Sequence, residues 1–235
     1  MKSTLMIFPW IFLLACSLPA PSAGAAQQAR PFLQVDFGAR TSPVQDGFVA
    51  ARASVAQVEG PLVYEFEGYP ETIATGTITL TLAAGRNSLA STGRLCARDR
   101  GPIPPEGKFN QGDLYRDFIS GPSTITLGIS GLKPGSLHEV RFYTFDKNRD
   151  QTMEIVNHSD GARGPKASVA WKKDQPFTET TANDIHTATL QAKAPSSGTL
   201  VFRVTSIGGG NAVINAIALS AVGRRGGRGG GGGGG

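Results

Sequence analysis

The stretch GLKPGSLHEVRFYTFD, residues 131–146, decides the fold class. Its Pro-Gly turn at 134–135 is followed by apolar and polar residues that alternate with period two, the pattern of a half-buried β-strand. His138 shares the strand parity of Val140 and Phe142, so we expect its imidazole on the buried face of that strand. A tight turn followed directly by an alternating run predicts an antiparallel strand that enters the core of a β-sandwich.

Runs of the same kind recur along most of the chain. They are rich in β-branched and aromatic residues, and Gly, Pro, Asn and Asp separate them. No window of useful length shows the i, i+3, i+4, i+7 spacing of an amphipathic helix. Many short strands without crossover helices predict an all-β antiparallel sandwich or barrel. About eleven strands in one domain favour a jelly-roll sandwich over a seven-strand immunoglobulin-type sandwich. The runs begin at residues 32, 61, 75, 113, 123, 138, 152, 166, 185, 199 and 211.

Residues 1–25 have the pattern of an export signal. A basic start at Lys2 precedes an apolar stretch over 5–14 and a small-residue end, and the apolar stretch is too short to span a bilayer. The letters LLAC ending at Cys16 also resemble a bacterial lipobox, which would place a lipid anchor on that cysteine. Ordinary cleavage is favoured, because Leu14 is not the small residue usual there. Both interpretations predict a secreted or cell-envelope protein without a transmembrane segment.

The remaining chain divides into three parts. A short linker is predicted over 26–31, one β-sandwich domain over 32–222, and a disordered Gly/Arg-rich tail over 223–235, because that tail cannot bury apolar surface. The tail is open to interpretation as a flexible linker or a truncated end. Cys16 is lost or lipidated on maturation, so Cys96 has no intrachain disulfide partner. The domain is long enough to be stabilised by its own core.

The net charge of +5 comes mostly from the two ends of the chain. Once Lys2, Arg224, Arg225 and Arg228 are set aside, basic and acidic residues nearly balance. A domain so balanced lacks the electrostatic footprint of a nucleic-acid-binding protein.

The segment RDRGPIPPEGKFNQGDLYRDF, residues 98–118, places an Arg-Asp step at either end of a loop rich in proline and glycine. The run from 113 is predicted to be a strand with Arg116 on one face and Asp117 on the other, so that each face mixes apolar and charged groups. A charge on a half-buried strand must be paired. Arg98-Asp99-Arg100 is the predicted partner, so we favour an architectural clamp over a ligand site. The ligand-site alternative would use Arg98, Tyr115 and Asp117.

Oxygen-bearing side chains alternate at Asp146, Asn148 and Asp150, as they do in calcium loops. The segment lacks the glycine at the sixth position and has Asn157 where an acidic residue is needed at the twelfth. A polar hairpin turn is therefore favoured over a structural calcium site. No other cofactor is predicted.

Several segments together resemble galactose-binding-like β-sandwich modules of secreted bacterial proteins, which are similar to malectin and to carbohydrate-binding jelly rolls. The resemblance implies a jelly-roll fold and non-catalytic glycan binding, sometimes with structural calcium. It matches no sugar-binding motif residue by residue. The segments are VDFGARTSPVQDGF, ARDRG, GDLYRDF, GLKPGSLHEVRFYTFD, TTANDIHTATLQAKAPSSGTLVFRV and NAVINAIALS.

We therefore expect an exported carbohydrate-binding module with a polysaccharide or another glycan as its partner. A sugar ring is commonly held on an exposed aromatic plate beside polar side chains, and Trp171 and Tyr69 are the candidates. The alternative for Trp171 is a core-capping role, which is slightly favoured because tryptophan is highly buried on average. Two other functions are open: a protein-interaction module of the envelope or extracellular matrix that uses sheet edges, and a polysaccharide hydrolase. The hydrolase would pair carboxylates from Asp99, Glu106, Asp113 and Asp117.

Overall fold

The computed structural model describes residues 31–85, 89, 93–104, 110–161, 164–174 and 183–222. The predicted signal peptide, the lipobox, most of the linker and the Gly/Arg-rich tail lie outside these residues, and so does Glu106. Within them, no helix is both long and apolar enough to cross a membrane.

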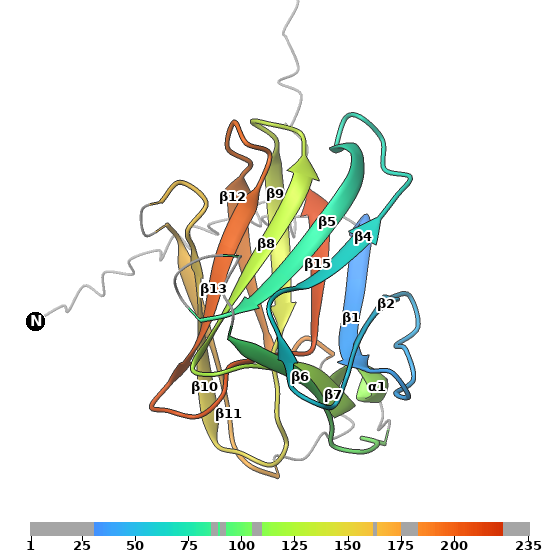
Figure 1. Cartoon of the computed structure of the whole chain (residues 1–235), viewed down its shortest axis with the longest axis vertical. Coiled ribbons are helices and arrows are strands. Elements are labelled where there is room, and N and C mark those ends of the chain that lie inside the picture. The colour runs from blue at the N-terminus through green and yellow to red at the C-terminus, as the bar shows by residue number, and fades with distance from the viewer. Residues whose placement is uncertain are drawn as a thin grey trace, which may run out of the picture.

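The described residues form three β-sheets and one short helix (Figure 1). The first sheet, in the order β12-β9-β15-β1-β2, contains β1 (Leu33–Ala39), β2 (Val49–Ala53), β9 (Leu137–Tyr143), β12 (Thr187–Lys193) and β15 (Ala216–Ala221). The second, in the order β11-β10-β13-β8-β5-β4, contains β4 (Leu62–Phe66), β5 (Ala74–Ala84), β8 (Thr124–Leu132), β10 (Gln151–Asn157), β11 (Lys166–Trp171) and β13 (Leu200–Ile207). The third, in the order β14-β7-β6-β3, contains β3 (Val58–Glu59), β6 (Arg94–Asp99), β7 (Asp117–Ser120) and β14 (Val213–Ile214).

The two larger sheets pack face to face. The rings of Phe142 on β9 and Phe202 on β13 lie 5.2 Å apart in an edge-on arrangement that joins the sheets. His138, Val140 and Phe142 are all fully buried, so the alternation predicted for this strand is confirmed. Every pairing between the described strands is antiparallel except that of β1 with β2. The structure is therefore the antiparallel β-sandwich that the sequence predicts.

The prediction of one strand from residue 113 is wrong. Helix α1 (Gly112–Arg116) comes first and β7 starts at Asp117. The helical turn buries Leu114 and Tyr115 together, and the Tyr115 hydroxyl donates a hydrogen bond to the carbonyl of Asn183, 2.9 Å away. A segment this short carries no periodicity that separates helix from strand, so tertiary packing determines its structure.

The small third sheet places β6 and β7 against the lower end of the sandwich in Figure 1. Arg100, just after β6, bonds to Asp146 in the connection between β9 and β10. That connection crosses from the first sheet to the second. Segments that are far apart in the sequence therefore meet at one end of the domain.

Candidate functional site

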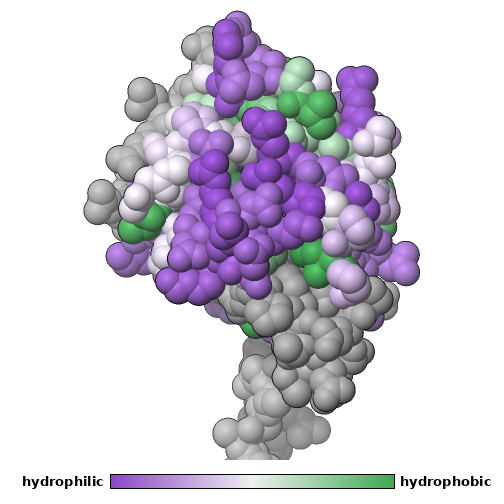
Figure 2. Space-filling model, turned by 90° about the horizontal axis from the view of Figure 1, so that it is seen from below, coloured by the Kyte–Doolittle hydropathy of each residue, from purple (hydrophilic) through white to green (hydrophobic). Residues whose placement is uncertain are grey.

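A recessed polar cavity of about 200 Å³ lies at this end, and we call it the basic pocket. Its walls come from the end of β6, β7, the β9–β10 connection, the first residue of β10, the loop after β13 and β14. Seen from below in Figure 2, hydrophilic residues cover much of the described surface at that end of the molecule. The lining residues are Arg98, Arg100, Phe118, Ser120, Asp146, Arg149, Gln151, Asn211 and Val213.

Arg100 forms a fixed wall of the basic pocket. Its Nε lies 3.0 Å from Oδ1 of Asp146 and its Nη2 lies 2.9 Å from Oδ2. The guanidinium carbon lies 5.5 Å from the ring centre of Phe118. A bidentate pair between arginine and a carboxylate is strong and directional, so both oxygens of the buried Asp146 are committed to Arg100.

Arg98 and Arg149 differ from Arg100, because both are exposed. Within the described ranges, neither has an acidic side chain within 4 Å. Among its described lining residues the pocket thus holds three guanidinium groups and one carboxylate, which is already paired. The pocket carries a net positive charge.

Amide and hydroxyl groups complete the lining. Gln151 donates through Nε2 to Oγ of Ser206 at 2.9 Å and to the carbonyl of Asn211 at 2.5 Å. Its Oε1 is buried and has no hydrogen-bond partner among the described residues. Asn211 donates through Nδ2 to Oγ of Ser120 at 3.2 Å. A buried acceptor without a partner costs free energy, so Gln151 can accept a hydrogen bond from a ligand or water.

The loop that follows β13, residues 208–210, depends on glycine. Gly208, Gly209 and Gly210 all have positive φ, between 85° and 103°, where residues with a Cβ are disfavoured. A Cβ at Gly210 would lie 3.3 Å from Nε2 of Gln151 and 3.5 Å from Nη1 of Arg149. The positive φ is therefore the main reason for glycine in this loop, which passes close to both residues at Gly210.

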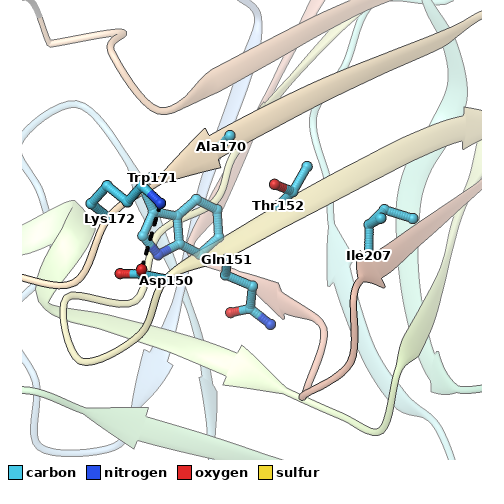
Figure 3. A pocket seen from close by; sticks show the side chains of 7 residues that line it. All are labelled: Asp150, Gln151, Thr152, Ala170, Trp171, Lys172 and Ile207. Atoms are coloured by element: carbon cyan, nitrogen blue, oxygen red, sulfur yellow. Dashed lines mark ion pairs between the residues drawn. The ribbon is translucent and has the colours of Figure 1, made fainter.

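A second, larger hollow of about 370 Å³ adjoins the first, and we call it the Trp171 pocket (Figure 3). Gln151 lines both pockets. On the rim, Nζ of Lys172 pairs with Oδ2 of Asp150 at 3.6 Å, and half of the Ile207 side chain is exposed. The lining residues are Asp150, Gln151, Thr152, Ala170, Trp171, Lys172 and Ile207.

Trp171 is not the exposed plate that sugar stacking requires, since only 4% of its surface is accessible. Its Nε1 donates to the carbonyl of Asp146 at 3.0 Å, and its ring lies 5.8 Å from that of Phe145. These contacts match the core-capping alternative. Tyr115 is also buried, and Tyr69 is half-buried with its ring 5.7 Å from that of Phe32. The three aromatic candidates therefore share no exposed surface.

Asp117 is fully buried, and its partners are not those predicted. Its Oδ2 accepts from the backbone N–H of Ala39 at 3.2 Å and lies 3.4 Å from Nη1 of Arg52. The predicted clamp is confirmed between Asp99 and Arg116, whose Oδ2 and Nη2 lie 2.7 Å apart. For Asp117 the partners come from the N-terminal strands, because Asp117 packs against β1. The sequence carries one signal for this at Gly38, where a Cβ would lie 1.7 Å from the carboxylate of Asp117.

Asp36 is a second buried carboxylate on the same arginine. Its Oδ2 lies 3.7 Å from Nη2 of Arg52 and accepts from the N–H of Gln45 at 2.9 Å. Burial raises the pKa of Asp36 to about 6. Burial, and then the charge of Asp36, raise the pKa of Asp117 to about 7. Because the two buried carboxylates share one guanidinium, the folded state favours a proton on one of them.

Asp117 is expected to make the domain less stable as the pH rises. Its folded pKa of about 7 lies above the ordinary 3.8, so the folded state binds more protons between these values and stability falls as pH rises through that window. Buried His138 and His186, with pKa values lowered to about 4, act oppositely between 4 and 6.5. Because both histidines remain in Asp117→Asn, the difference between wild type and variant reports on Asp117 and its coupling to Asp36. The free energy of unfolding is measured with urea at pH 4.5 and at pH 8. From the lower to the higher pH, the value for the variant should rise relative to that of the wild type by at least about 1.4 kcal/mol. A difference between the two proteins that is the same at both pH values would contradict the assignment.

Of the carboxylates proposed for hydrolysis, the three described aspartates have separate structural environments. Asp99 accepts from Oγ of Ser42 at 3.0 Å and from the N–H of Gly101 at 2.7 Å, besides its pair with Arg116. Asp113 is half-exposed on α1, and Asp117 is buried. Neither the basic pocket nor the Trp171 pocket contains any of the three aspartates.

The residues predicted as calcium ligands do not fit a calcium site as they are arranged. Asp146 directs both oxygens at Arg100, and its Oδ1 also accepts from the N–H of Asn148. Asp150 accepts from the N–H of Lys173 and pairs with Lys172. The described residues contain no group of three or more His, Cys, Asp or Glu side chains placed to hold a metal. The segment is a polar turn that joins the two sheets, and not a hairpin.

Comparisons with known proteins give structural resemblances alone. No family model and no curated protein matches the chain. The chain is similar to protein YXIM from Bacillus subtilis, with a TM-score of 0.36, 14% identity and coverage of 81% of this chain and 40% of the other. It is also similar to a Podospora anserina GH26-CBM35 β-(1,4)-mannanase, with a TM-score of 0.32, 15% identity and coverage of 72% and 29%.

Carbohydrate-binding modules are among the similar structures. A native family 35 carbohydrate-binding module from Clostridium thermocellum has a TM-score of 0.29 and 13% identity, and the match covers 53% of this chain and 90% of the module. The chain spans less than half the length of YXIM and of the mannanase. At these TM-scores and identities, the resemblances carry no functional weight beyond the fold class.

Proposed function

We propose that this chain is a non-catalytic, exported glycan-binding module whose sugar site is the basic pocket. The observation that carries the proposal is the convergence of polar side chains from separate elements on one recess. Specific small-ligand sites typically combine a concave shape with a few placed polar groups. Export is supported by the signal pattern in residues 1–25.

The lining groups match the chemistry of sugar hydroxyls, which both donate and accept hydrogen bonds. Arg98, Arg149 and Asn211 offer donors, while Oε1 of Gln151 is an acceptor without a partner among the described residues. A volume of about 200 Å³ is smaller than the roughly 300 to 1,000 Å³ of pockets for drug-sized ligands. The pocket therefore suits one sugar residue, and the adjoining Trp171 pocket leaves room for the next residue of a chain.

A non-catalytic role is supported by the state of the pocket's carboxylate. Glycoside hydrolysis normally needs two carboxyl groups that face the same bond, one of them a general acid. The carboxylate that lines the basic pocket, Asp146, has both oxygens bound to Arg100. This ion pair holds Arg100 in place and leaves Asp146 without an oxygen free to act as a general acid or a nucleophile.

The test is a glycan array on the full chain, followed by affinity measurements with Asn211→Ala. Wild type should bind at least one polysaccharide, and the variant should bind it about three- to tenfold more weakly, because one hydrogen-bonding side chain is lost. The matched control is Gln191→Ala, which removes an exposed amide on β12 outside the pocket and should bind as wild type does. If wild type ignores every glycan, the proposal is wrong, and protein interaction through sheet edges becomes the next hypothesis.

A further inference from the structure

We infer that the basic pocket binds an oxyanion substituent of a glycan, either the carboxylate of a uronic acid residue or a sulfate ester. Arg98 and Arg149 would hold this group while Arg100 forms the fixed wall. The inference rests on the proposed function and specifies the chemical class of its ligand.

The first support is the location of unbalanced charge. Next to the basic pocket, Lys172 is paired with Asp150, and Arg94 with Glu59 at 2.6 Å. Inside it, Arg100 is paired with Asp146. Arg98 and Arg149 alone among the arginines that line the pocket lack an acidic partner in the described part of the chain. Two cations in one recess repel each other, and a bound anion relieves that repulsion.

The second support is geometry. A planar guanidinium donates two parallel hydrogen bonds to a carboxylate or a sulfate, which gives both strength and orientation. Arg98 lies on β6, and Arg149 lies in the connection before β10. They approach the pocket from different elements, and both line it. An anion between them would be held from two directions.

The third support separates a glycan anion from other anions. Ser120, Gln151 and Asn211 line the same recess. They provide partners for the several alcohol hydroxyl groups that a sugar ring carries beside its acidic group and that a free inorganic anion lacks. A nucleic acid would need an extended basic surface, whereas basic and acidic residues nearly balance once the ends of the chain are set aside. The lining therefore favours a sugar that bears one acidic group.

The experiment compares one polymer with and without its charge and adds a second acidic polymer. Polygalacturonate and its fully methyl-esterified form share one backbone, and a sulfated polysaccharide forms the second acidic arm. The full chain should bind at least one acidic polymer at least tenfold more tightly than the ester, and added salt should weaken that binding. Arg98→Gln and Arg149→Gln should each lose about tenfold in affinity, since hydrogen bonds to charged groups are strong.

Lys193→Gln is the matched control, because it removes one exposed positive charge from β12, outside the basic pocket. It should bind as wild type does, and the melting temperatures of all three variants should be unchanged. Equal binding of acid and ester, or full binding by both arginine variants, overturns the inference while the proposed function stands. Binding to no polymer contradicts the proposed function itself. Inorganic phosphate that binds at the same arginines, with no polymer bound, identifies a site for free anions and also overturns the inference.

Discussion

Trp171→Ala is expected to destabilise the domain by about 3 to 5 kcal/mol, the usual range for truncation of a buried tryptophan. The ring is 96% inaccessible and packs beside Phe145 and His186. Truncation would also leave the carbonyl of Asp146 without the indole N–H that it accepts. Urea unfolding monitored by circular dichroism measures the loss directly.

Trp171→Phe is the control, because it keeps an aromatic ring and loses the N–H group. It should cost about 1 to 2 kcal/mol, for the lost indole hydrogen bond and the smaller ring, since the carbonyl of Asp146 still accepts from the backbone N–H of Arg149 at 3.1 Å. If Trp171→Ala instead unfolds as wild type does and loses polysaccharide binding, Trp171 is a ligand plate. The sugar site would then be the Trp171 pocket and not the basic pocket.

Asp117→Ala is expected to destabilise the domain by about 2 to 4 kcal/mol. The substitution leaves the buried N–H of Ala39 without its acceptor and removes one of the two carboxylates on Arg52. It also opens a space beside Gly38, whose missing side chain makes room for this carboxylate. Thermal and urea unfolding near pH 7 provide the measurement.

Asp113→Ala is the matched control, since it removes a half-exposed carboxylate four residues earlier and should change stability by less than about 0.5 kcal/mol. Binding of the preferred glycan should survive Asp117→Ala wherever the variant is folded, because Asp117 does not line the basic pocket. Unchanged stability together with lost binding would show that Asp117 belongs to a ligand site.

The sandwich could be predicted from the sequence because its determinants are local. Period-two alternation placed His138, Val140 and Phe142 on the buried face, where they lie. The helix at Gly112–Arg116 could not be predicted, because the burial of Leu114 and Tyr115 depends on segments distant in sequence, such as Asn183.

The site was less accessible to sequence reasoning than the fold. Arg98 was named as a ligand residue and does line the basic pocket, whereas Arg149, Gln151 and Asn211 were not named. Gln151 bonds to a residue 60 positions away, and Arg100 to one 46 positions away. Such pairs depend on the sheet topology and leave no local pattern. The run of glycines at 208–210 is a partial signal, since it marks a loop with positive φ that passes close to Gln151 and Arg149 at Gly210.

The central claim is that the basic pocket holds the sugar, and side-chain amide NMR tests it most directly. The NH₂ groups of Gln151 and Asn211 should shift in a saturable manner when the oligosaccharide selected on the array is titrated into the full chain. The NH₂ group of Gln191, on β12 outside the pocket, should not move. Shifts confined to Gln191 and its neighbours, or saturable binding that leaves both pocket amides unmoved, would contradict the account.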